Sequence, residues 1–115
     1  MSTRKNSYTK ELRYRFQEII DIISNSYKTI CATNGTIVIS ITMDRDAKKV
    51  IFEAAYSTNA SFNPTVIYEL LLSNRQFSAI PVVMNTICQK YSGYNKYYEE
   101  NQITAWDLYI IEDWE

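Results

Sequence analysis

The residue types that most often perform chemistry are sparse in this chain of 115 residues, which contains no histidine. The chain therefore lacks the commonest general base and the commonest metal ligand of proteins. Its two cysteines, Cys31 and Cys88, have no imidazole that could activate them as nucleophiles. They also do not form a Cys-x-x-Cys pair, the usual signature of a structural zinc site. Nucleophilic catalysis and zinc binding are thus disfavoured.

Carboxylate pairs are the remaining candidates for metal-assisted catalysis. They occur at Asp44/Asp46, Glu99/Glu100 and Glu112/Asp113. A two-metal site needs carboxylates that converge from separate elements. Asp44 and Asp46 instead fall in a short polar turn, where aspartate is favoured because its side chain bonds nearby backbone amides. We predict no catalytic residue, no metal site and no cofactor. An enzyme that uses carboxylates alone is the third-ranked alternative.

Tyrosine and acidic residues gather toward the end of the chain. Residues 91–98 contain four tyrosines, and residues 99–115 contain six acidic residues and no basic one. Tyrosine offers a large rigid body and a hydroxyl group, which suits recognition surfaces. We predict a protein-binding surface for a basic partner, made of Tyr94, Tyr97, Tyr98, Glu99, Glu100, Trp106, Glu112, Asp113 and Trp114. The competing interpretation is that Tyr91 and one of the pair Tyr97/Tyr98 close the core.

The start of the chain is basic. Five basic residues precede position 16, against Glu11 alone: Arg4, Lys5, Lys10, Arg13 and Arg15. Such a strip can contact phosphates, so nucleic-acid binding is the alternative function. Glu18 and Asp21 interrupt the strip, and the whole chain has a net charge of −1. A solvated helix face explains the same pattern.

Hydrophobic periodicity predicts the first three elements. Apolar residues three or four positions apart predict a helix over about Tyr8–Thr33. Two alternating segments, Thr36–Met43 and Lys49–Tyr56, predict strands. The polar stretch from Asp44 to Lys48 is short enough to join them in an antiparallel hairpin.

The second half of the chain predicts two short helices and a strand. Asn63-Pro64 reads as a helix start, with the helix running to about Asn74. A second helical pattern follows from Ser78 to about Tyr91, and Ile103–Ile111 reads as a strand. The segment between them, Tyr94–Asn101, fits a strand, a frayed helix or a turn.

We therefore predict an α+β fold of one domain, residues 1–115, in the order α-β-β-α-α-β. An antiparallel sheet of three or four strands would pack against the helices, and residues 1–7 would form a flexible basic start. We look for function on the second sheet face, which would carry Val38, Ser40, Thr42, Ile51, Glu53 and Ala55. The last strand is apolar on both sides, which predicts cover on both sheet faces. We favour helices on opposite faces over a partner protein as that cover.

The first residues contain no apolar signal segment, and no run of apolar residues is long enough to span a membrane. We accordingly predict a protein of the bacterial cytoplasm. The expected function is that of a small inhibitor, immunity or accessory protein of a phage or mobile element. Its partner would be a protein, including one that handles nucleic acids. Homodimerisation through the last strand or the second sheet face is a further prediction.

Overall fold

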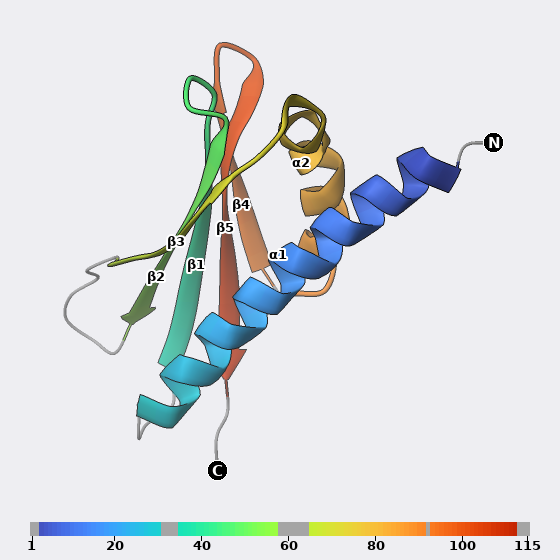
Figure 1. Ribbon diagram of the computed structural model, residues 1–115. Coiled ribbons are helices and arrows are strands. Elements are labelled where there is room, and N and C mark those ends of the chain that lie inside the picture. The colour runs from blue at the N-terminus through green and yellow to red at the C-terminus, as the bar shows by residue number, and fades with distance from the viewer. Residues whose placement is uncertain (1–2, 31–34, 58–64, 92, 113–115) are drawn as a thin grey trace.

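The computed structural model describes residues 3–30, 35–57, 65–91 and 93–112, with side chains for 9–26, 37–55, 68–91 and 93–110. Within these ranges the chain forms two helices and five strands (Figure 1). They are α1 (Thr3–Ile30), β1 (Gly35–Asp44), β2 (Lys49–Ser57), β3 (Thr65–Leu71), α2 (Asn74–Cys88), β4 (Gly93–Glu99) and β5 (Gln102–Glu112). The α+β class is confirmed. The predicted order, and the prediction of three or four strands, are wrong.

The five strands form one antiparallel sheet in the order β3-β2-β1-β5-β4. The last strand, β5, therefore lies inside the sheet, between β1 and β4. It pairs with β1 from Gly35–Glu112 to Thr42–Ala105 and with β4 on its other side. Residues 105–109 of β5 are thus paired on both edges, while the predicted dimerisation through the last strand or the second sheet face stays a prediction.

The first helix and the first hairpin agree with the sequence patterns. One face of α1 is buried, through Leu12, Phe16, Ile19, Ile20 and Ile23. α1 begins at Thr3 and so includes most of residues 1–7, for which we predicted flexibility. β1 and β2 pair continuously from Thr36–Ser57 to Asp44–Lys49, as the alternation of their residues predicts.

The predicted helix after Pro64 is wrong, because residues 65–71 form the edge strand β3. Its register places Tyr68 opposite Phe52 and Leu70 opposite Val50, so both side chains pack against the core. Leu71 points to the other side and is 79% exposed. The predicted cap at Asn63-Pro64 lies outside the described residues.

A single helix, α2, replaces the second predicted helix and starts earlier, at Asn74. Ser73 and Gln76 form a capping box at its start. The Gln76 backbone N–H donates to Ser73 Oγ at 3.2 Å, and the Ser73 N–H donates to Gln76 Oε1 at 3.0 Å. These bonds satisfy amides that a helix start otherwise leaves unpaired. They fix the boundary between β3 and α2.

The segment that the sequence left ambiguous forms a hairpin, in which β4 and β5 are joined by Glu100 and Asn101. Both turn residues have positive φ, 50° and 66°, which is typical of the tight type I′ turn. Such a turn matches the twist of the two strands and holds them in register.

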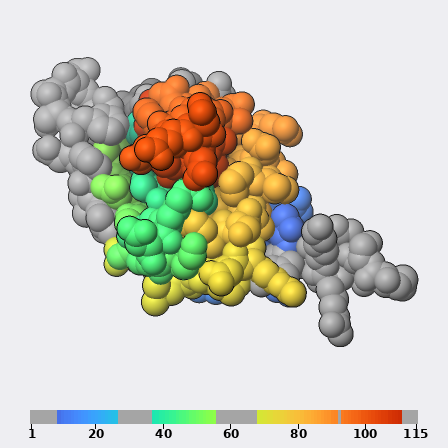
Figure 2. Space-filling model, turned by 90° about the horizontal axis from the view of Figure 1, so that it is seen from above, coloured from blue at the N-terminus to red at the C-terminus, as the bar shows by residue number. Residues whose placement is uncertain are grey.

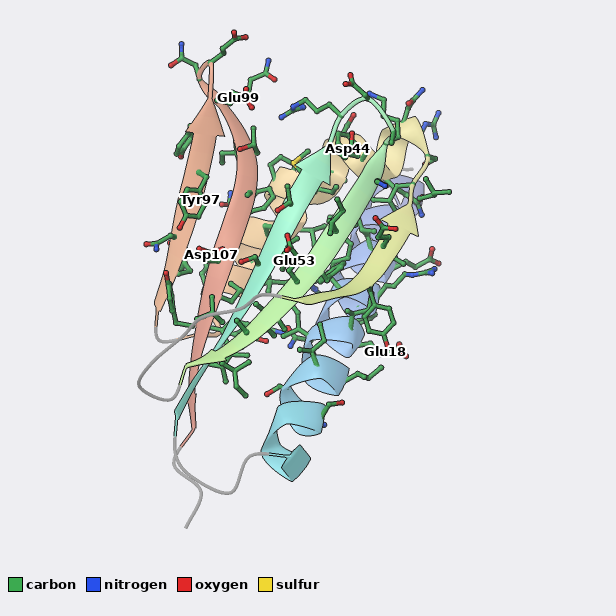
Figure 3. The ribbon with its side chains drawn as sticks, turned by 90° about the vertical axis from the view of Figure 1, so that its left-hand side faces the viewer. Glu18, Asp44, Glu53, Tyr97, Glu99 and Asp107 are labelled. Carbon is green, nitrogen blue, oxygen red and sulfur yellow. The ribbon has the colours of Figure 1, made fainter. Side chains whose placement is uncertain are left out.

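Both helices pack on the same face of the sheet (Figures 1 and 3). The core between them contains side chains from both helices and from β1, β2 and β5. Phe16 of α1 meets Phe52 of β2 edge to face, with ring centres 5.3 Å apart. Our expectation that helices cover both sheet faces is therefore wrong, since neither α1 nor α2 covers the second face.

Candidate protein-binding surface

The sheet face that points away from α1 and α2, called the outer face below, is the candidate functional surface. Because side chains alternate along a strand, each strand contributes every second residue to it. Its described residues on the four strands β2, β1, β5 and β4 include Lys49, Ile51, Glu53, Ala55, Val38, Ser40, Thr42, Asp44, Gln102, Ala105, Asp107, Tyr109, Gly93, Asn95, Tyr97 and Glu99. Val38 and Ala55 are buried despite lying on this face. The exposed half is thus the one nearer the two hairpin turns.

Four carboxylates are distributed over the exposed half of the outer face (Figure 3). Each comes from a different strand: Asp44 from β1, Glu53 from β2, Glu99 from β4 and Asp107 from β5. Lys49 belongs to the same face, but its Nζ lies 3.1 Å from Oε1 of Glu69 on β3 and is engaged there. Among the described residues, no ion pair neutralises the four carboxylates, so this surface is acidic.

Asp107 is held from two sides at the centre of this surface. Ser40 of β1 donates a hydrogen bond from Oγ to Asp107 Oδ1 at 2.6 Å. Tyr97 of β4 donates from its hydroxyl to Asp107 Oδ2 at 2.7 Å. Nearby, the Asn95 side-chain amide donates to the Tyr109 hydroxyl at 2.7 Å. These bonds fix the position of one carboxylate and tether the ends of two tyrosine rings.

The contact with Asp107 changes the pKa of the Tyr97 hydroxyl. Its hydrogen bond to Asp107 raises the pKa of Tyr97 above the ordinary value, because ionisation would break the bond and place a phenolate beside a carboxylate. Tyr97 therefore stays neutral at physiological pH and acts as a hydrogen-bond donor.

A pocket of about 510 Å³ adjoins the acidic surface, between the β1–β2 turn and the β4–β5 turn. Figure 2 shows this end of the molecule, with the two turns side by side. The residues that line the pocket include Thr42, Asp44, Asp46, Glu99 and Glu100. Arg45 also lines it and bridges the two hairpins, because its Nη2 donates to the Ile103 carbonyl at 2.8 Å. The acidic character of the outer face thus extends to its end.

The structure divides the nine residues of the predicted protein-binding surface. Tyr97 and Glu99 lie on the outer face, and Glu100 lies in the adjacent turn. Trp106 lies in the core with 0% of its surface exposed, so it is unavailable to a partner in this structure. The side chain of Glu112, together with Asp113 and Trp114, lies outside the described residues.

Tyr94 and Tyr98 are exposed, but they lie on the opposite side of β4, toward α2. Lys96 stands between them, and its Nζ donates to Asn85 Oδ1 of α2 at 3.2 Å. The same Nζ lies 5.9 Å from the centre of the Tyr94 ring. These two tyrosines therefore belong to a different surface from Tyr97. Tyr91, predicted as a possible core residue, packs against the core.

The basic residues of the alternative function lie on α1. The Tyr14 ring has Lys10 Nζ at 5.8 Å and the Arg13 guanidinium at 5.4 Å, whereas Arg15 is exposed. The side chains of Arg4 and Lys5 lie outside the described residues. Among residues 9–26, the part of α1 whose side chains are described, three acidic residues offset these three basic ones: Glu11, Glu18 and Asp21. No strongly basic patch results there.

The sequence places Ser40 and Glu53 on the second face, and the alternation of the last strand places Asp107 and Tyr109 on one side of it, but local patterns do not join these two sets into one surface. Asp107 is the single charged residue of the stretch 103–111, which apart from Thr104 is otherwise apolar. That interruption is the signal that could have identified it. Its contact with Ser40 depends on the β1–β5 pairing, which local periodicity does not reveal.

Comparison with known proteins found no matching family model, no matching curated protein and no matching solved structure. Within the described ranges, no group of three or more potential metal-ligating side chains could hold an ion. Neither described helix is long and apolar enough to cross a lipid bilayer.

Proposed function

We propose that this chain is a small non-enzymatic protein that binds a basic surface of another protein through the exposed half of its outer face. The observation that carries the proposal is the presence of four carboxylates, from four strands, on a face that neither helix covers. Surfaces of opposite charge steer two proteins together and favour the correct partner.

The construction of the outer face supports binding rather than core formation. Its tyrosines end in hydroxyl groups that are hydrogen bonded to neighbours on the sheet, as in Tyr97–Asp107 and Asn95–Tyr109. A side chain that is already tethered loses less conformational entropy when a partner binds. Tyrosine is also among the residues that most often anchor interfaces.

The sign of the charge favours a basic protein over other partners. Four carboxylates repel the phosphates of nucleic acids, and they equally disfavour a second copy docking face to face. The basic channel of a nucleic-acid-handling enzyme has the complementary charge. An inhibitor, immunity or accessory protein of a phage or mobile element, acting in the cytoplasm of a bacterial host, fits this chemistry.

The proposal is tested with the purified full chain as bait for soluble proteins of the host cell. We compare the wild type with Glu53→Lys plus Glu99→Lys, which reverses charge on the outer face, and with Glu18→Lys on the exposed side of α1 as control. Loss of a captured basic protein in the double variant but not in the control supports the proposal. Equal capture by all three proteins, or capture of acidic proteins alone, contradicts it.

Nucleic-acid binding by α1 is separated by a salt titration on a generic DNA duplex. If α1 binds phosphates, affinity falls steeply with salt and is lost in Lys10→Glu plus Arg13→Glu. That outcome would replace the proposed function. Absence of salt-dependent duplex binding is the result we expect.

A further inference from the structure

We infer that the group recognised at the centre of the outer face is an arginine side chain of the partner, bound on the carboxylate of Asp107 beside the rings of Tyr97 and Tyr109. This inference rests on the proposed function and names the chemistry of its central contact.

The hydrogen bonding of Asp107 leaves room for a planar, two-pronged donor. Each carboxylate oxygen accepts one hydroxyl hydrogen bond, Oδ1 from Ser40 and Oδ2 from Tyr97. An ionised carboxylate has about four acceptor positions, two on each oxygen. A guanidinium group can therefore donate to both oxygens at once without displacing either hydroxyl. A lysine ammonium group cannot form this paired contact.

The two rings flank this position along the sheet. Tyr109 lies two residues from Asp107 on the same face of β5, and Tyr97 is paired with Ala105, two residues away in the other direction. Hydrogen bonds to Asp107 and from Asn95 hold the ring ends in place. A guanidinium plane packs favourably against tyrosine rings, which adds to the preference for arginine.

The charge of Asp107 is unmatched within the described part of the chain, since no basic side chain there forms an ion pair with it. Glu53 lies in the same row across the sheet, separated from Asp107 by Ser40 alone. Two strand spacings correspond to about 10 Å between these positions. Glu53 thus adds negative potential for any cation, while the paired geometry at Asp107 selects arginine.

The direct test is a titration of the isotope-labelled full chain with three end-blocked peptides, Thr-Thr-X-Thr-Thr, in which X is arginine, lysine or citrulline. Citrulline has nearly the shape of arginine but no charge. We expect saturable shifts of the Asp107, Ser40 and Tyr97 amide signals with the arginine peptide, at a dissociation constant of about 1–10 mM. We expect the lysine peptide to bind roughly threefold more weakly or worse, and the citrulline peptide to give no saturable shift.

Two variants localise the contact. Asp107→Asn should weaken the binding of the arginine peptide about tenfold, as expected for the loss of a charge-assisted paired contact. Glu18→Gln, on helix α1, removes one negative charge as Asp107→Asn does, but it should leave the affinity for the arginine peptide unchanged. Circular dichroism and thermal unfolding confirm that each variant is folded. Because the three peptides are compared first on the wild-type chain, the test does not depend on the folding of a variant.

Equal binding of the arginine and lysine peptides, binding of neither, or unchanged affinity in Asp107→Asn would each overturn the inference. The two proposals fail separately. Partner capture that is lost in Glu53→Lys plus Glu99→Lys, combined with equal binding of the arginine and lysine peptides, leaves the proposed function standing and removes the arginine site. Capture that is insensitive to the outer face removes the proposed function, whatever the peptides show.

Discussion

The two faces of the sheet are made from adjacent residues of the same strands, yet they have opposite chemistry. The inner face is apolar and is closed by both helices, with Phe52, Trp106 and Leu108 fully buried. The outer face carries hydroxyl, amide and carboxylate groups at neighbouring positions such as Glu53 and Asp107. The described helices leave this second face open (Figure 3).

This difference separates what stabilises the fold from what is free to serve function. Burial of apolar side chains is the dominant favourable contribution to folding. Polar groups on an open face contribute little to stability, because water replaces most of what they gain. Substitutions on the inner face should therefore act on stability and those on the outer face on binding.

Adjacent residues of β2 should show the contrast most strongly. We expect Phe52→Ala to lower the free energy of unfolding by about 3–5 kcal/mol, because it leaves a cavity beside Phe16. We expect Glu53→Ala to change it by no more than about 0.5 kcal/mol. Urea unfolding followed by circular dichroism measures both. Similar losses for the two variants would show that the outer face is part of the packed structure.

The edge strand β3 provides a second pair, Leu70 and Leu71. Leu70 packs partly against the core, so Leu70→Ala should cost about 1–2 kcal/mol of unfolding free energy. Leu71 is mostly exposed, so Leu71→Ala should cost less than about 0.5 kcal/mol. In a helix the two residues would share a face and cost similar amounts. Equal effects in urea unfolding would therefore contradict the strand.

That pair also shows why the sequence predicted some elements and not others. The buried face of α1 and the alternation of β1 and β2 are long and regular enough to identify one structure. The segment 65–71 is short, and its apolar residues fit one side of a helix: Val66, Ile67, Leu70 and Leu71. Pairing with β2 decides between the two structures, and that interaction is tertiary. Ser73 and Gln76 carried a local signal, the capping box, that marks the true helix start.

The candidate surface was less predictable than the fold for a related reason. Ser40 and Asp107 are 67 residues apart and meet only because β5 inserts between β1 and β4. The tyrosine-rich segment was identified, but its alternation along β4 sends Tyr97 to one side and Tyr94 and Tyr98 to the other. The composition of the sequence identified β4 as the strand that contributes tyrosines. Which side chains lie together on one face follows only from the order of the strands in the sheet.

The turn at the acidic end of the outer face should respond to substitution in the stabilising direction. Glu100 has a φ of 50°, which costs a residue with a side chain about 1 kcal/mol or more, and asparagine tolerates this conformation best after glycine. We expect Glu100→Asn to raise the unfolding free energy by about 0.5–1 kcal/mol. Glu99→Asn, which removes the same charge from the end of strand β4, is the control and should bring no such gain. A loss of stability in Glu100→Asn would contradict the type I′ turn.

The smallest effect concerns two tyrosines whose pKa values are raised for different reasons, one on each side of the sheet. Burial is the largest cause for Tyr91, on the helix side, whereas the hydrogen bond to Asp107 is the largest cause for Tyr97. The folded chain favours the neutral form of Tyr97. The stabilisation of the fold by the Tyr97–Asp107 hydrogen bond is therefore complete below the unfolded pKa of about 10 and is lost as pH rises through the folded pKa.

We expect Asp107→Asn to lower the pKa of Tyr97 toward its ordinary value and to leave the pKa of Tyr91 unchanged. Ser40→Ala, which keeps the carboxylate, should leave both raised. Titration of the labelled tyrosine ring carbons by NMR measures each pKa, and a Tyr97 pKa that is the same in Asp107→Asn as in the wild type would show that Asp107 does not hold this hydroxyl in solution.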